Sequence, residues 1–287
     1  MFENFDYKEN ESMKNHTTLH IGGNARWFLL PKNEEELRKI IKECEKNLLH
    51  YFILGNGSNL LVSDDGFNGV IISTERLNRI KMLGEDLQVS AGVKLFSLNL
   101  FCRENALSGL EWSYGIPGTV GGACFMNAGA FGGEFCSLIK SVRILKNGKI
   151  VERTKIQYSY RKGCLKDGEI LLSVVLSLKK GNKNKIKAEQ EKCIQLRKEK
   201  QPYDYHSLGS VFKRDEKFAP AYLIEKFGLK GLRKGGVQVS RKHSGFIINK
   251  QNGRAKDFLA LVELIEKIAE TNGYKFQREF VMLGFDK

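Results

Sequence analysis

The most constraining feature of the sequence is a glycine-rich segment with almost no charge, residues 111–134, which reads EWSYGIPGTVGGACFMNAGAFGGE. Seven of these residues are glycine, yet Trp112, Ile116, Val120 and Phe125 stand among them. Flexible linkers are rich in serine and lack such side chains, so we expect an ordered and buried segment. Backbone of this kind can pack against a large planar ring. A tightly packed strand crossing is the structural alternative.

A second glycine-rich stretch, GNGSNLLV at residues 55–62, directly follows the apolar run YFIL. Its glycines, asparagines and serine are expected to expose backbone N–H groups in a tight turn, an arrangement that can hold a pyrophosphate. The stretch does not match the GxGxxG fingerprint, because Leu60 occupies the position of the third glycine, and no Walker lysine follows. A purely structural turn explains this stretch equally well when it is considered alone.

Composition limits the class of protein. With 287 residues, of which 41% are hydrophobic, the chain can bury real cores, and we expect two or three domains. The net charge of +14 attracts polyanions, whether nucleic acid, acidic membrane or phosphorylated small molecules. No recognisable nucleic-acid module fits the sequence. The chain has no apolar run of membrane-spanning length and no basic-then-apolar start, so we expect a cytoplasmic protein.

The cysteines and histidines do not follow the spacing of known metal sites. The six cysteines form no CxxC pair and lie at least a dozen residues apart along the chain, and the five histidines form no HExxH motif. The spacing therefore predicts reduced, structural thiols and no metal.

Periodicity predicts a mixed α/β protein of the α+β class. Apolar positions at helical spacing predict a helix over residues 33–48 capped by Asn33, followed by strands at 51–54 and 70–72. Residues 77–178 favour short strands, including a hairpin at Asn147-Gly148, with one helix near residues 95–105. A basic stretch, KKGNKNKIK at residues 179–187, is our candidate boundary. The last third favours helices through Leu196, near Pro220 and over residues 258–268, the last with Leu264 on its apolar side.

Two further motifs carry reactive side chains. YSYR, at residues 158–161, ends in an arginine that can pair with a carboxylate or a phosphate, although most single arginines are solvated. LGSVFK, at residues 208–213, places Ser210 after a glycine. It is not the GxSxG elbow, because Leu208 and Phe212 flank the serine at the elbow's glycine positions, and a hydrolase triad is not supported.

In order along the chain, these segments resemble the UDP-N-acetylenolpyruvoylglucosamine reductase family. The matching segments are NHTTLHIGGNA (15–25), LGNGSNLLV (54–62), LEWSYGIPGTVGGACFMNAGA (110–130), YSYR, LGSVFK, LIEKFGLKG (223–231), GGVQVSRKHSGFIIN (235–249) and REFVMLG (278–284). Together they span nearly the whole chain.

The resemblance implies an FAD-binding module of the vanillyl-alcohol-oxidase type in two subdomains, residues 1–75 and 76–182, and an α/β substrate lobe at residues 183–287. It implies noncovalent FAD, NADPH as cosubstrate and a UDP-sugar substrate. Apart from the resemblance, we expect no nucleic-acid partner and a monomer. The residues implied to contact FAD are Gly55, Asn56, Gly57, Ser58, Asn59, Gly115, Ile116, Pro117, Gly118, Thr119, Gly122, Ala123, Asn127 and Gly129.

The resemblance also implies three catalytic residues. These are Arg161 from YSYR, Ser210 from LGSVFK and Glu279 before the last apolar strand. In the family's reaction a flavin hydride adds to the methylene carbon of an enolpyruvyl ether; Arg161 and Glu279 would stabilise the resulting negative charge, and Ser210 would donate the quenching proton. The residues implied to contact substrate or nucleotide are Lys200, Gln238 and Asn249.

The sequence departs from the family pattern at two places. Arg214-Asp215 stands where the family often has Asn-Pro, and the short spacing from Arg161 to Lys200 resembles the branch that lacks an extra tyrosine-bearing loop. Two other functions remain open from the residues alone. One is a flavin oxidase or dehydrogenase acting on another small substrate, against which LGSVFK and REFV argue, and the other is a nucleic-acid-binding protein attracted by charge.

Overall fold

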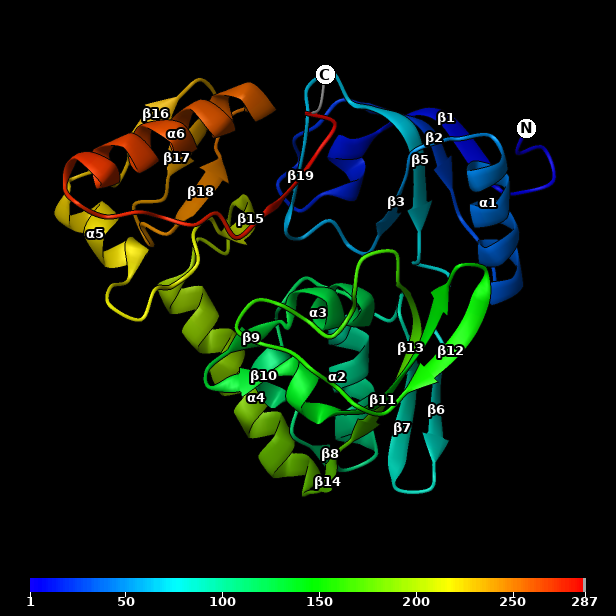
Figure 1. The fold of residues 1–287 in the computed structure, drawn as a ribbon. Coiled ribbons are helices and arrows are strands. Elements are labelled where there is room, and N and C mark those ends of the chain that lie inside the picture. Colours follow the sequence, from blue (N-terminus) through cyan, green and yellow to red (C-terminus); the bar gives the residue numbers. More distant parts are fainter. Residues whose placement is uncertain (286–287) are drawn as a thin grey trace. The chain divides into compact units, whose positions relative to one another are not determined.

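The computed structural model describes residues 1–285, and the chain forms two compact units. The first unit contains residues 1–9, 27–56 and 69–196, and the second contains residues 10–26, 57–68 and 197–287. The chain therefore crosses from one unit to the other five times. Figure 1 follows the elements along the chain from blue to red.

The first sheet has the strand order β1-β2-β5-β3, with β1 at Tyr7–Ser12, β2 at Asn24–Leu29, β5 at Phe67–Ser73 and β3 at Tyr51–Leu54. Helix α1, Glu34–Lys46, buries Leu37, Ile40 and Ile41 in a shared core with Val70 and Ile72. Its predicted cap is confirmed, because the Asn33 side chain accepts a hydrogen bond from the Glu36 N–H at 2.9 Å. The predicted strands at 51–54 and 70–72 are also present.

The second sheet of the first unit has the order β12-β11-β13-β7-β6. Its strands are β6 (Ile80–Leu83), β7 (Asp86–Ser90), β11 (Ile139–Lys146), β12 (Lys149–Arg153) and β13 (Ile170–Ser177). The predicted hairpin is confirmed: Asn147 and Gly148 both adopt positive φ, 48° and 70°, as a two-residue turn between twisted strands requires.

Helices α2 (Leu95–Glu104) and α3 (Val120–Met126) share one apolar core with this second sheet. Within this core α3 packs on β7 and β13. The helix carries the middle of the glycine-rich segment, so the apolar side chains of that segment are what fix it to the sheet. Short elements surround it: β8 (Leu107–Ser108), η2 (Glu111–Ser113), β9 (Gly129–Ala130), β10 (Gly133–Glu134), η3 (Phe135–Leu138) and β14 (Lys179–Lys180).

The second unit has a four-stranded sheet with the order β15-β18-β17-β16, covered by helix α6, Ala255–Thr271 (Figure 1). Its strands and second helix are β15 (His206–Ser210), β16 (Arg233–Lys234), β17 (Val237–Val239), β18 (Phe246–Asn249) and α5 (Pro220–Lys226). Helix α6 buries Phe258, Leu261 and Ile265, whereas Leu264 is 43% exposed and was wrongly placed on the apolar side. Leu264 is exposed because the turn of the helix over the three residues after Leu261 places its side chain outside the buried stripe.

The second unit also contains segments from the first quarter of the chain. Strand β4, Leu60–Val62, pairs in parallel with β19, Val281–Leu283, near the other end of the sequence. The 3-10 helix η1, Met13–His16, lies in the same unit. The loop that follows the YFIL strand is therefore fixed partly by the C-terminal segment.

The basic stretch at residues 179–187 is mostly regular structure. It contains β14 and the start of helix α4, Lys183–Lys200, and the two compact units divide after Leu196, inside that helix. The predicted mixed α/β character is confirmed across both units. Within residues 1–285, none of the helices has both the length and the apolar character that crossing a membrane requires.

One prediction concerns acid stability. The His243 ring accepts a hydrogen bond at Nδ1 from the Gly245 N–H at 3.1 Å, and burial lowers the pKa of this histidine. The unfolded chain takes up a proton on this residue below its ordinary pKa of about 6.5, so the folded state loses stability as pH falls through that value. We therefore expect His243→Gln to lose less of its urea midpoint than the wild type between pH 7.5 and 5.5. The exposed His50→Gln is the control, and equal losses in all three proteins would contradict the prediction.

Candidate functional site

The loop at residues 55–59 is held by close backbone contacts. On the first-unit side, a Cβ added to Gly55 would lie 2.4 Å from Thr119 Oγ1, and Asn56 Nδ2 donates to the Pro117 carbonyl at 2.7 Å. The two glycine-rich segments predicted from the sequence therefore meet. On the second-unit side, Gly57 has φ +58°, and a Cβ there would lie 2.1 Å from the His16 carbonyl oxygen.

Two backbone carbonyls of the loop accept hydrogen bonds from other segments of the second unit. The Gly57 carbonyl accepts from the Thr18 N–H at 3.3 Å, and the Asn59 carbonyl accepts from the Val281 N–H at 2.9 Å. A left-handed residue among short polar residues turns successive N–H groups toward one side, and such a concavity binds anions. Ser58 itself is half-buried.

The glycine-rich segment, predicted to pack against a planar ring, has one buried and one exposed side. Val120, Ala123 and Cys124 are buried in the first-unit core, while Pro117, Gly122 and Phe125 are exposed. The expectation of a wholly buried segment is therefore only half right, because a helix of small residues packs on the sheet with one side. Gly115, Ile116 and Gly118 are half-buried, and Thr119 caps α3 by accepting from the Gly122 N–H at 3.3 Å.

Asn127 holds the YSYR loop against the glycine-rich segment. It is fully buried with φ 44°, its side chain donates to the Ser159 carbonyl at 3.0 Å, and it accepts from the Cys136 N–H at 3.1 Å. The Gly163 N–H donates to the Phe125 carbonyl at 2.9 Å. Asn127 and the Phe125 carbonyl therefore join the YSYR loop to the glycine-rich segment.

Arg161 extends from this anchored loop. Its Nη2 donates to the Gly129 carbonyl at 3.1 Å, and its backbone has φ 53°. Arg161 and Gly129, both predicted site residues, are thus in contact within the first unit. A positive φ is uncommon for a residue with a long side chain and is maintained here by the surrounding loop.

We expect Asn127→Asp to weaken the anchor of this loop. The new carboxylate keeps the acceptor for Cys136 but faces the Ser159 carbonyl without a proton to donate, which costs about 2 kcal/mol of the free energy of unfolding. Urea denaturation measures the loss. Asn147→Asp is the matched control, because Asn147 has a similar φ of 48° in an exposed turn. A loss no larger than that of the control would show that the Asn127 amide is not the anchor.

Ser210 and Glu279 lie on neighbouring segments of the second unit. Ser210 ends β15 beside Phe246, after a register shift at Gly209, which has φ +90°. The Glu279 N–H donates to the Val211 carbonyl at 2.8 Å, and Phe212 and Arg278 form a β-bridge. The structure therefore brings together two candidate residues that lie far apart in the sequence.

Asn59 connects this pair to the glycine loop, a connection that the sequence did not reveal. Its Nδ2 donates to the Glu279 carbonyl at 3.0 Å, while the neighbouring strands β4 and β19 pair in parallel. Within the second unit, Asn59, Glu279 and the Ser210 segment are therefore joined by hydrogen bonds. The GNGSN and REFVMLG motifs lie close together only in the tertiary structure, and no local pattern in the sequence predicts it.

The predicted substrate residues belong to the second unit. Gln238 donates through Nε2 to the Gly231 carbonyl at 2.8 Å and is buried. Asn249 Nδ2 donates to the Leu19 carbonyl at 3.1 Å, and its Oδ1 accepts from the Gly253 N–H at 2.8 Å. These contacts are structural. Lys200 is exposed at the end of α4.

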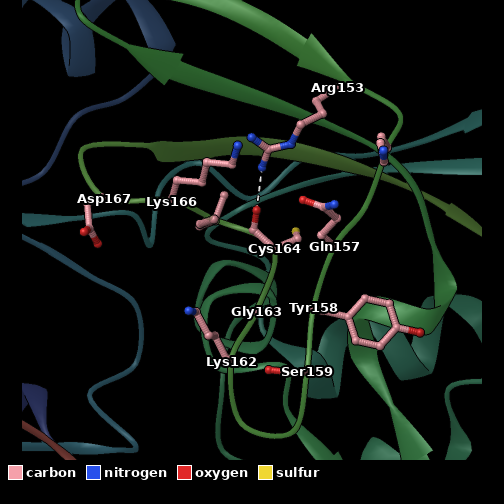
Figure 2. A pocket seen from close by; sticks show the side chains of 11 residues that line it. Arg153, Gln157, Tyr158, Ser159, Lys162, Gly163, Cys164, Lys166 and Asp167 are labelled. Carbon is pink, nitrogen blue, oxygen red and sulfur yellow. Dashed lines mark hydrogen bonds between the residues drawn. The ribbon is translucent and has the colours of Figure 1, made fainter.

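A cavity of about 560 Å³ in the first unit was not predicted from the sequence. Figure 2 shows it lined by residues of the segment 153–167, including Arg153, Lys162 and Lys166. The YSYR motif contributes Tyr158 and Ser159 to this lining. The cavity is therefore basic and lies beside the loop that carries Arg161.

The residues present fit a nucleotide with a flat ring and a pyrophosphate. Within the first unit, Gly55 leaves no room for a side chain, and the half-buried to exposed residues 115–118, which contact this part of the loop, carry no charge. FAD has both of these parts. The contact between the two glycine-rich segments is consistent with their binding one ligand together.

Comparisons with known proteins identify both parts of the chain. Residues 25–154 match the family model of an FAD binding domain, and residues 201–283 match that of the UDP-N-acetylenolpyruvoylglucosamine reductase C-terminal domain. The UDP-N-acetylenolpyruvoylglucosamine reductase of Clostridium kluyveri is 43% identical, covering 93% of this chain and 89% of that protein. The protein of the same name from Streptococcus pneumoniae is 37% identical, covering 100% of this chain and 97% of that protein.

A solved structure agrees with these relatives. The crystal structure of UDP-N-acetylenolpyruvylglucosamine reductase from Thermus caldophilus superposes with a TM-score of 0.85 at 32% identity, covering 97% of this chain and 98% of that one. The mixed α/β fold with an FAD-binding module and a separate C-terminal lobe is thereby confirmed. The chain belongs to the UDP-N-acetylenolpyruvoylglucosamine reductase family.

Proposed function

We propose that this protein is a flavin-dependent oxidoreductase that reduces the enolpyruvyl ether of UDP-N-acetylglucosamine-enolpyruvate to UDP-N-acetylmuramate, a step of peptidoglycan precursor synthesis. Family membership over nearly the whole chain supports the substrate class. The observation that carries the proposal is the hydrogen-bonded connection of the glycine loop, through Asn59, to Glu279 and the Ser210 segment. It joins a nucleotide-binding element to candidate proton-transfer groups.

The chemistry that bound FAD would supply is hydride transfer from NADPH to the methylene carbon of the enolpyruvyl group. Gly55, Asn56, Gly57 and Ser58 would hold its pyrophosphate, and the backbone at 115–118 with Gly122 and Gly129 would face its ring. The chain holds it without a covalent bond in this proposal.

The chain's own residues then stabilise the negative charge that develops on the substrate and supply a proton to it. Addition of hydride to the methylene carbon places negative charge on the adjacent carbon and its carboxylate. Arg161 holds that carboxylate, with Glu279 orienting the charged groups, and the Ser210 hydroxyl gives its proton to the adjacent carbon. The high pKa of a serine hydroxyl is no obstacle toward so basic a carbon. Lys200 contacts the charged nucleotide, and Gln238 and Asn249 shape the substrate lobe.

The proposal also includes the domain boundaries, the reductant, the cellular location and the oligomeric state. Residues 1–75 and 76–182 form the two FAD subdomains, and residues 183–287 form the substrate lobe. NADPH is the reductant, the enzyme acts in the cytoplasm as a monomer, and the basic balance of +14 favours capture of both anionic nucleotides.

An anaerobic half-reaction experiment tests the function. Flavin bound to the purified protein is first bleached with NADPH, and UDP-N-acetylglucosamine-enolpyruvate is then mixed in a stopped-flow instrument. We expect rapid return of the oxidised flavin spectrum with formation of UDP-N-acetylmuramate, and no return with UDP-N-acetylglucosamine. Failure of the enolpyruvyl substrate to restore the spectrum would overturn the proposal.

A further inference from the structure

Three buried cysteine side chains from distant parts of the sequence meet in the first unit. Cys124 lies on α3, Cys136 in η3 and Cys164 in the loop that follows YSYR. Their Sγ atoms all lie within 4.8 Å of one another, and those of Cys124 and Cys164 are 3.3 Å apart. Each residue is at most 4% exposed. A buried cysteine commonly serves as a small apolar residue, but that role does not require three sulfur atoms to converge.

The spacing of the sulfurs suits a tetrahedral metal ion. Zn–S bonds are about 2.3 Å long, which places thiolates around zinc about 3.8 Å apart. Cys124 and Cys164 would separate by about half an ångström from their 3.3 Å to reach this distance. A disulfide would use only two of the sulfurs and leave the third without a role.

Charged side chains next to the cluster complement a zinc site with thiolate ligands. Arg153 donates to the Cys164 carbonyl and pairs with Glu169 at 3.0 Å, and Lys146 lies 3.5 Å from the same carboxylate. These three side chains carry a net charge of +1. Three thiolates around Zn²⁺ carry −1, so the charges balance in a place where a net charge is costly.

One cysteine of the cluster, Cys164, borders the basic cavity. Gly163 lines it as well, and Figure 2 shows the Arg153 side chain reaching the Cys164 carbonyl. No histidine, aspartate or glutamate among the described residues joins the three cysteines. A fourth ligand must therefore be water or another exchangeable group from the cavity side, the pattern of an open zinc position.

We propose that Cys124, Cys136 and Cys164 form a zinc site with three thiolate ligands and one exchangeable position. Thiol protons leave to solvent as the ion binds, and no electron is transferred. The ion would tie together α3, η3 and the segment that carries Arg161 three residues before Cys164. The site lies outside the residues assigned to flavin and substrate, and its test is independent of turnover.

Zinc content and coordination test the site. The flavin-loaded protein is incubated with one equivalent of ZnCl₂, desalted, and measured by inductively coupled plasma mass spectrometry. We expect close to one zinc per chain, and X-ray absorption at the zinc edge should show three sulfur neighbours at about 2.3 Å. Retention of less than about a tenth of this amount, or a coordination shell of only nitrogen and oxygen, would overturn the proposal.

A matched pair of variants assigns the ligands. Cys136→Ser removes one sulfur with little change of volume, and Cys102→Ala changes a buried cysteine of the same core outside the cluster. We expect at least a tenfold loss of retained zinc in the first and none in the second. Equal retention by Cys136→Ser and the wild type would refute the site. If Cys136→Ser does not fold, the sulfur count from X-ray absorption on the wild type decides the question.

Discussion

Ser210→Ala is expected to abolish turnover while leaving the flavin reducible. The serine acts only after the hydride has reached the substrate, so NADPH should bleach the bound flavin at near the wild-type rate. Anaerobic reoxidation by the enolpyruvyl substrate should slow by at least the roughly 10²- to 10⁴-fold that one general acid contributes. Stopped-flow absorbance measures both half-reactions separately.

Ser207→Ala is the matched control for this experiment, because Ser207 is a half-buried serine on the same strand, β15. Arg161→Ala and Glu279→Gln should show the same division between half-reactions, since both are assigned to charge that develops only in the second. Equal slowing of reduction and reoxidation in Ser210→Ala would make the serine a binding or folding residue. The proton donor would then be another group.

Gly57→Ala is expected to destabilise the protein and deplete its flavin. The residue has φ +58°, and the added Cβ would lie 2.1 Å from the His16 carbonyl oxygen and 2.9 Å from Thr17 Cα. The left-handed backbone costs about 1 kcal/mol, and forced overlap with backbone adds about 1–3 kcal/mol. We therefore expect a loss of about 2–4 kcal/mol in the free energy of unfolding, measured by urea denaturation, and a lower flavin-to-protein absorbance ratio.

Gly84→Ala is the control that separates the cost of the left-handed backbone from the cost of steric overlap at the added Cβ. Gly84 has φ +61°, nearly that of Gly57, but nothing lies within 4 Å of its added Cβ in the turn between β6 and β7. Its loss should stay near 1 kcal/mol with full flavin content. If the two variants lost the same stability and both kept their flavin, close packing at Gly57 would not be needed for the site.

The sequence predicted local elements correctly where a short-range pattern of a few residues defines them. The Asn33 cap, the Asn147-Gly148 hairpin and the Pro220 helix depend on residues within a few positions of each other, and all are present. Leu264 was misplaced because helical periodicity fixes a buried stripe only to within one residue at its edge. The half-exposed glycine segment was predicted to be buried, because composition shows that a helix packs but not which side of it faces the core.

By itself, the sequence determined the fold class, the family resemblance and the identity of the candidate residues, since motifs in order along the chain carry that information. Only the tertiary structure joined Asn59 to Glu279, placed Asn127 behind the YSYR loop, and brought Cys124, Cys136 and Cys164 together. The physical reason is that these contacts arise from strand pairing and core packing between residues 12 to 220 positions apart. Such contacts leave no periodic or short-range mark in the sequence, so cysteines whose spacing predicted no metal site can still converge in one core.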